Sequence, residues 1–392
     1  MERFDKAYFD AGVPRVGTDS VKWDGMFAET GDSAMIPMWV ADMDFPSPPA
    51  VYDALAGVLA RRTWGYTLSG DADKQALCGF WKRRHGVDID PAWVLASPCV
   101  VTGLKLAVRA AAKPGEGVLI NTPVYGPFYA SIRENGRRIV ESPLAIDERG
   151  LYVMDLADME DKLASGEARA VMICSPHNPG GRAWTREELT AVASMCARYG
   201  ATLICDEIHA DFVYAPGEHV SVMSIEEAKG RRVILCAASK TFNVAGLEQS
   251  AIVCDSDALR EAIAADMNAS GVKAGNAFAL AATRACYTDS DAWLDGLLAY
   301  LKDNRDAMMA FAAEHWPRVR VMPAQATYLM WIDCSALGLS QEELLERIHA
   351  AHVKVNDGLF FGERGRGFIR LNVGCPRAQL MEALERLKDV LA

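Results

Sequence analysis

The sequence predicts an α/β protein built around a mostly parallel sheet. Short apolar runs alternate with amphipathic segments, which is the strand–helix–strand order of such sheets. The runs show no polar alternation, and continuous apolar strands suit a sheet that is covered on both faces. The predicted strands are Gly117–Ile120, Ala170–Cys174, Thr202–Cys205, Val233–Cys236 and Ala251–Cys254.

The segment between the second and third of these strands has a clear helical period. Residues 186–199 place four apolar side chains on one helical face: Leu189, Val192, Ala193 and Cys196. Thr185 stands just before two glutamates, which is typical of an N-cap residue. We therefore expect a helix over residues 186–199.

The two ends of the chain differ from this middle part. The first 45 residues contain several prolines and have little helical period, so we expect them to follow an irregular path up to a first helix near Ala50. The last hundred residues mix helical and strand patterns, with helices expected over residues 292–316, over 341–352 and from Arg377. We predict an N-terminal segment (1–45) that joins a small C-terminal α+β domain (286–392), and a large domain (46–285).

Charge and cysteine content exclude several classes of protein. The 392 residues include 41 Lys and Arg against 52 Asp and Glu, a net charge of −11. An acidic chain repels nucleic-acid phosphates and anionic membrane surfaces, so neither is an expected partner. No apolar stretch is long enough to cross a membrane, and the N-terminus lacks the apolar core of a signal peptide. Ten cysteines without a CxxC pair suit buried, reduced thiols, and we expect a cytoplasmic protein.

Polar residues close several of the predicted strands. They are Asn121, Ser175–Asn178, Asp206 and Ser239–Lys240. Sites in parallel α/β sheets lie at the carboxyl ends of strands, so we expect these residues to converge. Most lysines are solvated on the surface, but Lys240 follows an apolar strand among small residues, and a desolvated lysine has a lowered pKa and can form a Schiff base. Asp206 could act as a base, bind a metal or pair with a cationic ring nitrogen, but no second ligand group supports a metal and none is expected.

Several motifs resemble the fold-type I pyridoxal-phosphate enzymes, the class I/II aminotransferase superfamily. Within it the chain is similar to the MalY/PatB-type branch of cystathionine β-lyases and C–S lyases. The motifs run in order along nearly the whole chain: Met38–Phe45, Gly65–Thr67, Ser175–Gly181, Asp206–Asp211, Ser239–Gly246, Ala326–Leu329 and Arg370–Asn372. The resemblance implies a large domain with a mostly parallel central sheet that binds pyridoxal phosphate, and a smaller α+β domain.

The resemblance also implies roles at the cofactor ring. Lys240 would hold the cofactor covalently and later move the Cα proton, and Asp206 would keep the pyridine nitrogen protonated. Asn178 would donate to the ring's phenolic oxygen, and Tyr125 would stack on the ring face. His209 stands where many aminotransferases of the superfamily carry a tyrosine, and a packed core histidine is the alternative.

The phosphate would lie at a helix N-terminus. Val100 and Val101 precede the helical pattern over residues 104–112, and the resemblance places the phosphate there with Ser239 nearby; a helix start without a ligand is the alternative. Tyr66 would reach the phosphate of a partner subunit, which implies a homodimer with shared active sites. Many aminotransferases carry a phosphate-binding arginine eight residues after the lysine, whereas this chain has Glu248. One phosphate charge must therefore be neutralised elsewhere.

The substrate would be a small amino acid. Arg370 would clamp its carboxylate, since a guanidinium suits bidentate pairing. Asn178, Val40 and Ala41 would complete this part of the pocket. Some branch members have a second aromatic residue where this chain has Gly126, so we expect a wider pocket. The run 362–367 is glycine-rich and is either a flexible loop at the entrance or a surface turn.

These residues predict β-elimination from a cysteine S-conjugate such as cystathionine, giving pyruvate, ammonia and a thiol. An aminotransferase built from the same residues is the alternative, and a non-catalytic regulator is a further one. Glu248 and His209 favour the lyase, and the intact lysine, aspartate and arginine argue against loss of catalysis.

Overall fold

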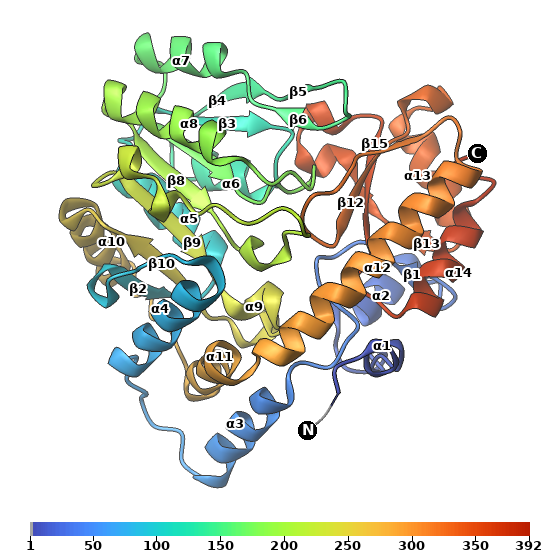
Figure 1. The fold of residues 1–392 in the computed structure, drawn as a ribbon, viewed down its shortest axis with the longest axis horizontal. Coiled ribbons are helices and arrows are strands. Elements are labelled where there is room, and N and C mark those ends of the chain that lie inside the picture. The colour runs from blue at the N-terminus through green and yellow to red at the C-terminus, as the bar shows by residue number, and fades with distance from the viewer. Residues whose placement is uncertain (1–2) are drawn as a thin grey trace.

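A seven-stranded sheet lies at the centre of the larger region of the computed structural model, which describes residues 3–392 (Figure 1). Across the sheet the strands are β2 (Val94–Ser97), β10 (Ser250–Cys254), β9 (Arg232–Cys236), β8 (Thr202–Asp206), β7 (Ala170–Cys174), β3 (Gly117–Thr122) and β4 (Arg138–Pro143). Strands β9, β8, β7, β3 and β4 are parallel, and β10 runs antiparallel to both of its neighbours. The predicted mostly parallel sheet is confirmed, and each of the five apolar runs forms a strand.

Helices cover both faces of this sheet. One face packs against α5 (Val100–Ala111), α6 (Pro127–Arg133) and α10 (Asp257–Ala269). The other packs against α4 (Asp71–His85), α7 (Leu156–Ala164), α8 (Arg186–Tyr199) and α11 (Ala277–Asp289), and α3 (Pro49–Ala60) lies against α11. In β3, Val118 and Ile120 pack on the face that α5, α6 and α10 cover, and Leu119 packs on the opposite face. Both faces of the strand are buried, which explains why its sequence does not alternate between apolar and polar residues. Helix α8 has the predicted bounds, and Thr185 and Glu188 cap its N-terminus reciprocally.

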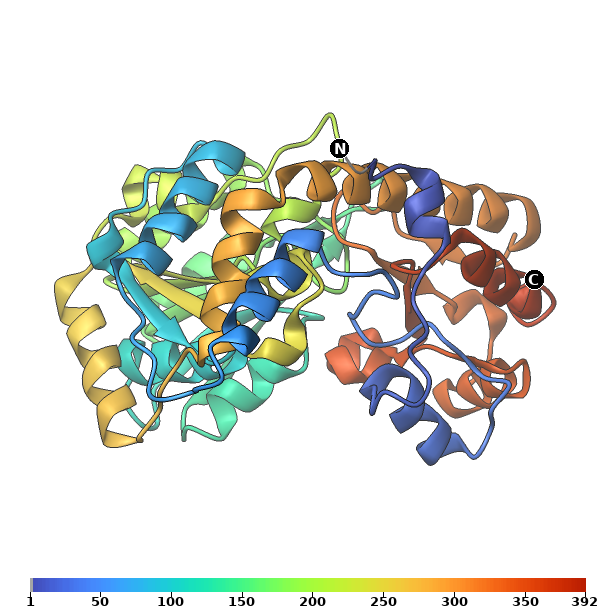
Figure 2. The same cartoon turned by 90° about the horizontal axis from the view of Figure 1, so that it is seen from below.

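A second, four-stranded sheet forms the core of the smaller region. It contains β11 (Arg320–Val321), β12 (Leu329–Asp333), β15 (Phe368–Asn372) and β14 (Asn356–Asp357), in that order. Helices α13 (Gln341–Ala350) and α14 (Arg377–Leu387) belong to the same region. The long helix α12 (Asp291–His315) runs along both regions, as Figure 2 shows. The three helices predicted for this part of the chain are confirmed to within a few residues.

The N-terminal segment lies with the C-terminal elements in Figure 2, and β1 (Ile36–Pro37) pairs in parallel with β13 (Val353–Lys354). The expectation of an irregular segment without a helix before residue 50 is wrong, since it contains α1 (Lys6–Asp10), a π-helix over Val21–Gly25 and α2 (Met26–Thr30). Five-residue helices are too short to display a helical period. Asp5 caps α1 by accepting hydrogen bonds from the backbone of Ala7 and Tyr8.

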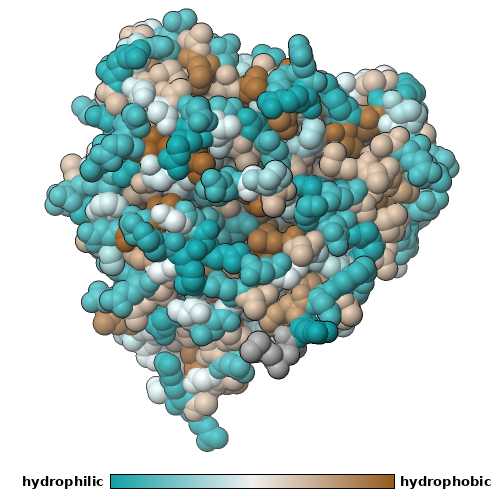
Figure 3. Space-filling model, viewed as in Figure 1, coloured by the Kyte–Doolittle hydropathy of each residue, from teal (hydrophilic) through white to brown (hydrophobic). Residues whose placement is uncertain are grey.

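A short hairpin of β5 (Ala145–Ile146) and β6 (Tyr152–Val153) completes the strands, and the four-residue α9 (Ala238–Thr241) completes the helices. The face seen in Figure 3 carries mainly hydrophilic side chains with scattered apolar ones. All ten cysteines are free thiols. No helix of residues 3–392 is both long and apolar enough to cross a membrane.

Candidate active site

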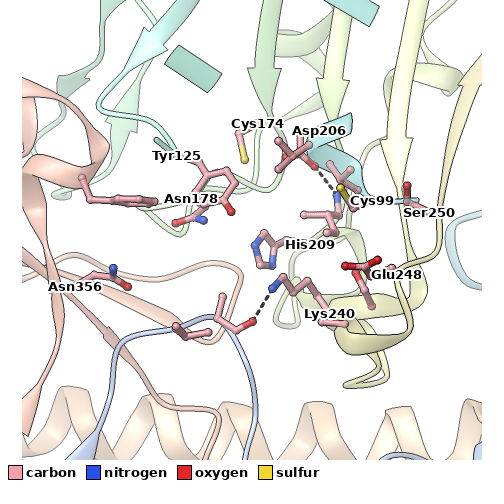
Figure 4. A pocket seen from close by; sticks show the side chains of 18 of the residues that line it. Cys99, Tyr125, Cys174, Asn178, Asp206, His209, Lys240, Glu248, Ser250 and Asn356 are labelled. Carbon is pink, nitrogen blue, oxygen red and sulfur yellow. Dashed lines mark hydrogen bonds between the residues drawn. The ribbon is translucent and has the colours of Figure 1, made fainter. Parts of the chain in front are cut away.

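A cavity of about 390 Å³ lies between the carboxyl edge of the seven-stranded sheet and the smaller region. The sheet side contributes residues that follow β2, β3, β7, β8 and β9, and the other side contributes Trp39, Val40, Ala41, Asn356, Phe360 and Arg370. Every residue given a role toward the cofactor or the substrate lines this cavity except Tyr66. Of the strand-end residues expected to converge, Asn178, Asp206, Ser239 and Lys240 line it, whereas Asn121 and Ser175 do not. Figure 4 shows side chains from both regions pointing into the same space. Strand ends that are far apart in sequence therefore meet in one pocket.

Lys240 lies on α9, directly after β9, and its side chain crosses the pocket toward the smaller region (Figure 4). Its Nζ donates a hydrogen bond to the backbone oxygen of Ala41 at 2.7 Å. Burial lowers the pKa of Lys240 because it disfavours the ammonium form. A lysine with a lowered pKa and a neutral hydrogen-bond partner can act as a nucleophile and as a base.

Asp206 ends β8 and faces the pocket without a cationic partner among residues 3–392. Its Oδ1 accepts a hydrogen bond from the backbone of Ile208 at 3.1 Å. Burial raises the pKa of Asp206 to about 7. A buried carboxylate that lacks a counterion suits a cationic ring nitrogen.

His209 lies between Asp206 and Lys240 in Figure 4. Burial lowers the pKa of His209 to about 3, and the charges of Lys240 and Arg370 act in the same direction. Its Nδ1 is buried without a hydrogen-bond partner in the described chain. His209 is therefore a neutral imidazole with one polar atom available inside the pocket.

Arg370 supplies the opposite wall, from β15. Its guanidinium donates to Oδ1 of Asn178 at 3.0 Å, to the backbone oxygen of Trp39 at 2.9 Å and to Oδ1 of Asn356 at 2.5 Å. All three acceptors are neutral, no carboxylate pairs with Arg370 in the described chain, and its Nε is unpartnered. Burial lowers the pKa of Arg370 to about 10. A buried guanidinium held by neutral groups is ready to bind an anion such as a carboxylate.

A helix N-terminus closes the sheet side of the pocket. Cys99 caps α5, its Sγ accepting from the backbone of Thr102, and the first two N–H groups of the helix, at Val100 and Val101, have no acceptor in the described chain. Free N–H groups at the start of a 12-residue helix bind anions. Ser239 and Glu248 line the same pocket.

A hydrogen-bonded group behind the pocket links the segments that carry Lys240 and His209. Asp211 accepts from Oγ1 of Thr241 at 2.6 Å and bonds Nε2 of His85 at 2.9 Å. Burial opposes ionisation of Asp211, but the hydrogen bond from His85 prevails and lowers its pKa. Glu207 bonds His219 at 2.9 Å, so the acidic residues around Asp206 point in different directions. No metal-binding group of three or more His, Cys, Asp or Glu occurs in residues 3–392.

The substrate side of the pocket differs from the expectation at Gly126. A Cβ there would lie 2.7 Å from the backbone oxygen of Phe360 and 3.2 Å from its ring, so Phe360 occupies the space beside Tyr125. The predicted wider pocket is therefore wrong, because a residue from the smaller region fills it. The glycine-rich run contains a short 3₁₀ turn, Glu363–Gly365, with Glu363, Arg364 and Arg366 exposed, which agrees with the surface turn; Gly365 itself packs against Gly358.

Tyr66 lies outside the pocket, on the segment between α3 and α4, and is fully exposed. The pocket also contains residues that were not predicted for the site, among them Cys99, Asn356 and Phe360. Cys99 could have been found from its place just before the predicted helix. Asn356 and Phe360 sit in stretches with no local signal of function.

The pocket offers an anion site at α5, a carboxylate for a ring nitrogen, a buried lysine and an unpaired arginine. These groups fit the phosphate, pyridine and aldehyde of the expected cofactor, together with an amino-acid carboxylate. The orphaned Nε of Arg370 and Nδ1 of His209 are consistent with a pocket shaped for such a ligand.

Comparisons with known proteins agree with this fit. The family model "Aminotransferase class I and II" matches residues 34–387. The chain is 40% identical to "Cystathionine beta-lyase PatB" of Bacillus subtilis over 98% of this chain and 100% of that protein. It superposes on cystalysin from Treponema denticola, which contains pyridoxal 5'-phosphate, with a TM-score of 0.94 and 32% identity over 98% of each chain. The PLP-bound C–S lyase from Staphylococcus hominis matches with a TM-score of 0.90 and 29% identity, again over 98% of each chain.

Proposed function

This chain belongs to the class I and II aminotransferase family, and from that membership we infer that it is a pyridoxal-phosphate-dependent carbon–sulfur β-lyase. The substrate class is a cysteine S-conjugate such as cystathionine, and the products are pyruvate, ammonia and a thiol. The observation that carries the proposal is the unpaired Arg370 facing Lys240 and Asp206 across one cavity.

The cofactor would be held from the sheet side of the pocket. Lys240 would bind it covalently, and the N–H groups of Val100 and Val101 with Ser239 would receive its phosphate. Asp206 would hold a proton on the ring nitrogen, and Tyr125 would cover the ring. Asn178 and His209 would contact the ring from the neighbouring strand ends. When bound, pyridoxal phosphate supplies an electron sink for the charge that develops at the substrate Cα.

The amino acid would be oriented from the other side. Arg370 would bind its carboxylate, with Asn178, Val40 and Ala41 around it. Lys240 Nζ would remove the proton from Cα, because its neutral form is favoured by burial. The Cβ–S bond then breaks, its electron pair leaves with the sulfur, and the enamine that remains is hydrolysed to pyruvate and ammonia.

We further propose a homodimer whose two sites are shared through Tyr66. The support is that Tyr66 is fully exposed on a segment whose Trp64 and Leu68 are exposed as well. A large exposed apolar cluster is typical of an interface. We propose a reducing compartment, the cytoplasm, as the place of action, and the ten free thiols support it.

An end-point assay tests the proposed reaction. Purified protein loaded with pyridoxal phosphate is given L-cystathionine or S-methylcysteine, with no keto-acid acceptor, and pyruvate and free thiol are measured together. We expect many turnovers with equal amounts of both products. A single turnover that leaves the cofactor in its amine form, without thiol, would identify an aminotransferase and exclude the lyase.

A further inference from the structure

Glu248 is an unpaired carboxylate at the phosphate end of the pocket. It lines the cavity together with Val101, Ser239, Lys240 and Ser250, and Figure 4 draws its side chain among those of the pocket. Glu248 is exposed, and its carboxylate makes no hydrogen bond or ion pair within residues 3–392, although its backbone N–H donates to the oxygen of Ala245 at 3.2 Å. Its backbone φ is +53°, in the left-handed region, so it follows a tight turn that fixes its position. A carboxylate here repels the phosphate that the N-terminus of α5 would bind, unless a cation lies between them.

Lys273 is an unpaired cation on the segment between α10 and α11. It is exposed, no carboxylate pairs with it in the described part of the chain, and its Nζ lies 5.8 Å from the ring centroid of Tyr66. Tyr66 belongs to the segment between α3 and α4, which protrudes at the bottom of Figure 1. On that segment Trp64 is 58% exposed and Leu68 is 86% exposed. Lys273 therefore lies beside an exposed apolar surface formed by Trp64, Tyr66 and Leu68, which a binding partner could bury.

We propose that Lys273 of the partner subunit completes the phosphate end of each active site by pairing with Glu248. The proposal rests on the homodimer proposed above, in which Tyr66 enters the partner's pocket. Because Lys273 is held over Tyr66 in the same subunit, it must travel with that side chain. A two-fold dimer repeats each contact, so both sites gain a cation.

The charges of the two surfaces match. Within residues 3–392 no cation pairs with Glu248 and no anion pairs with Lys273, and docking through Tyr66 would supply each with an opposite charge. The ammonium would lie between the carboxylate and the phosphate, and would neutralise the charge left open because Glu248 stands eight residues after Lys240. Trp64 and Leu68 would lose their contact with water in the same step.

Charge reversal tests the pairing through cofactor affinity, with no substrate present. We expect Lys273→Glu to weaken pyridoxal-phosphate binding at least about tenfold, because it places a second carboxylate beside Glu248 and the phosphate. The double variant Glu248→Lys with Lys273→Glu restores opposite charges and should bind the cofactor within about threefold of the parent. Equilibrium dialysis at low and at high salt measures both, and the loss should shrink at high salt.

Lys113→Glu is the matched control. Lys113 is an exposed lysine before β3, at the opposite edge of the sheet from the pocket, so the same charge change there should leave cofactor affinity unaltered. Circular dichroism checks folding of each variant, and Lys273→Met replaces Lys273→Glu if the latter does not fold. Unchanged cofactor affinity in the Lys273 variant, or a double variant that is no better than it, overturns the pairing.

Sedimentation separates this proposal from the lyase assignment. A parent protein that is monomeric with tightly bound cofactor overturns the pairing and leaves the lyase reaction intact. A dimer that shows the charge-swap rescue but releases no thiol from cystathionine supports the pairing and overturns the lyase.

Discussion

The two walls of the active-site pocket hold buried charge in opposite ways. On the sheet wall, Asp206 receives one backbone hydrogen bond, and burial raises its pKa to about 7. On the wall from the smaller region, Arg370 donates to three neutral oxygens and stays charged although burial lowers its pKa to about 10. The carboxylate of Asp206 therefore needs a bound cation to be stabilised in its charged form. The guanidinium of Arg370 is already stabilised by hydrogen bonds within the protein.

The difference has a consequence for the order of binding. Asp206 gains its counterion only when a cationic ring enters, so cofactor binding and ionisation of Asp206 are coupled. Arg370 is ionised before any ligand arrives, so it can select a carboxylate from the start. We therefore expect cofactor affinity to respond to the sheet wall and substrate affinity to the arginine wall.

Lys240→Ala should have the largest effect, since Lys240 is anchored on the sheet wall and bonds Ala41 on the other. We expect lyase activity to fall at least about 10⁴-fold, because both covalent cofactor binding and proton removal are lost. The absorbance band of the lysine-bound cofactor should disappear with it. Lys302→Ala, on the surface of α12, is the control. A variant that retained turnover would remove Lys240 from the mechanism.

Asp206→Asn removes the buried carboxylate on the sheet side of the pocket and leaves Arg370 unchanged. We expect kcat to fall about 10³-fold and cofactor binding to weaken, because the amide cannot hold a charged ring nitrogen. The measurements are steady-state kinetics and dialysis of the cofactor. An unchanged cofactor affinity would contradict the coupling of ionisation to binding.

The same variant makes a prediction about stability and pH. The folded pKa of about 7 exceeds the ordinary 3.8, so the cofactor-free protein loses stability as pH rises from 3.8 through about 7. Asp206→Asn removes that loss, and above pH 7 the cofactor-free variant should be more stable than the parent by up to about 4 kcal/mol. Urea unfolding at pH 5 and pH 8 measures the difference, which should be less than half as large at pH 5 as at pH 8.

Arg370→Ala removes the guanidinium on the side of the smaller region and leaves Asp206 unchanged. We expect KM for cystathionine to rise about 10²-fold, because the substrate carboxylate loses a charge-assisted pair. Cofactor affinity should stay within about twofold, in contrast to Asp206→Asn. Arg370→Lys should recover part of the loss, since an ammonium keeps the charge without the planar fork. A cofactor affinity that fell as far as in Asp206→Asn would show that the two walls do not act separately.

Asp211→Asn should have the smallest effect, because Asp211 lies behind the pocket and acts through Thr241. We expect kcat to fall about tenfold with KM unchanged, since the helix that carries Lys240 loses one of its anchors. The pH at which the lysine-bound cofactor changes absorbance should move as well, and a merely structural role would leave that pH unchanged. Thr241→Ser keeps the hydroxyl and serves as the conservative control.

Residues at strand ends could be predicted from the sequence because the carboxyl ends of parallel strands lie along the same edge of the sheet. Asp206 and Lys240 follow apolar runs, and both line the cavity. Phe360 could not be predicted, since its place beside Tyr125 depends on how the smaller region packs on the sheet. The same holds for Asn356, which reaches Arg370 across two antiparallel strands.

The sequence by itself determined the strands, the helix over 186–199 and the strand-end residues, because apolar period and capping are local properties. The tertiary structure decided which charges remain unpaired. Arg370 meets Asn178 and Trp39 from distant parts of the chain, and Glu248 and Lys273 meet no opposite charge within residues 3–392. Pairing depends on distances between segments that lie far apart in sequence, and only the packed fold fixes those distances.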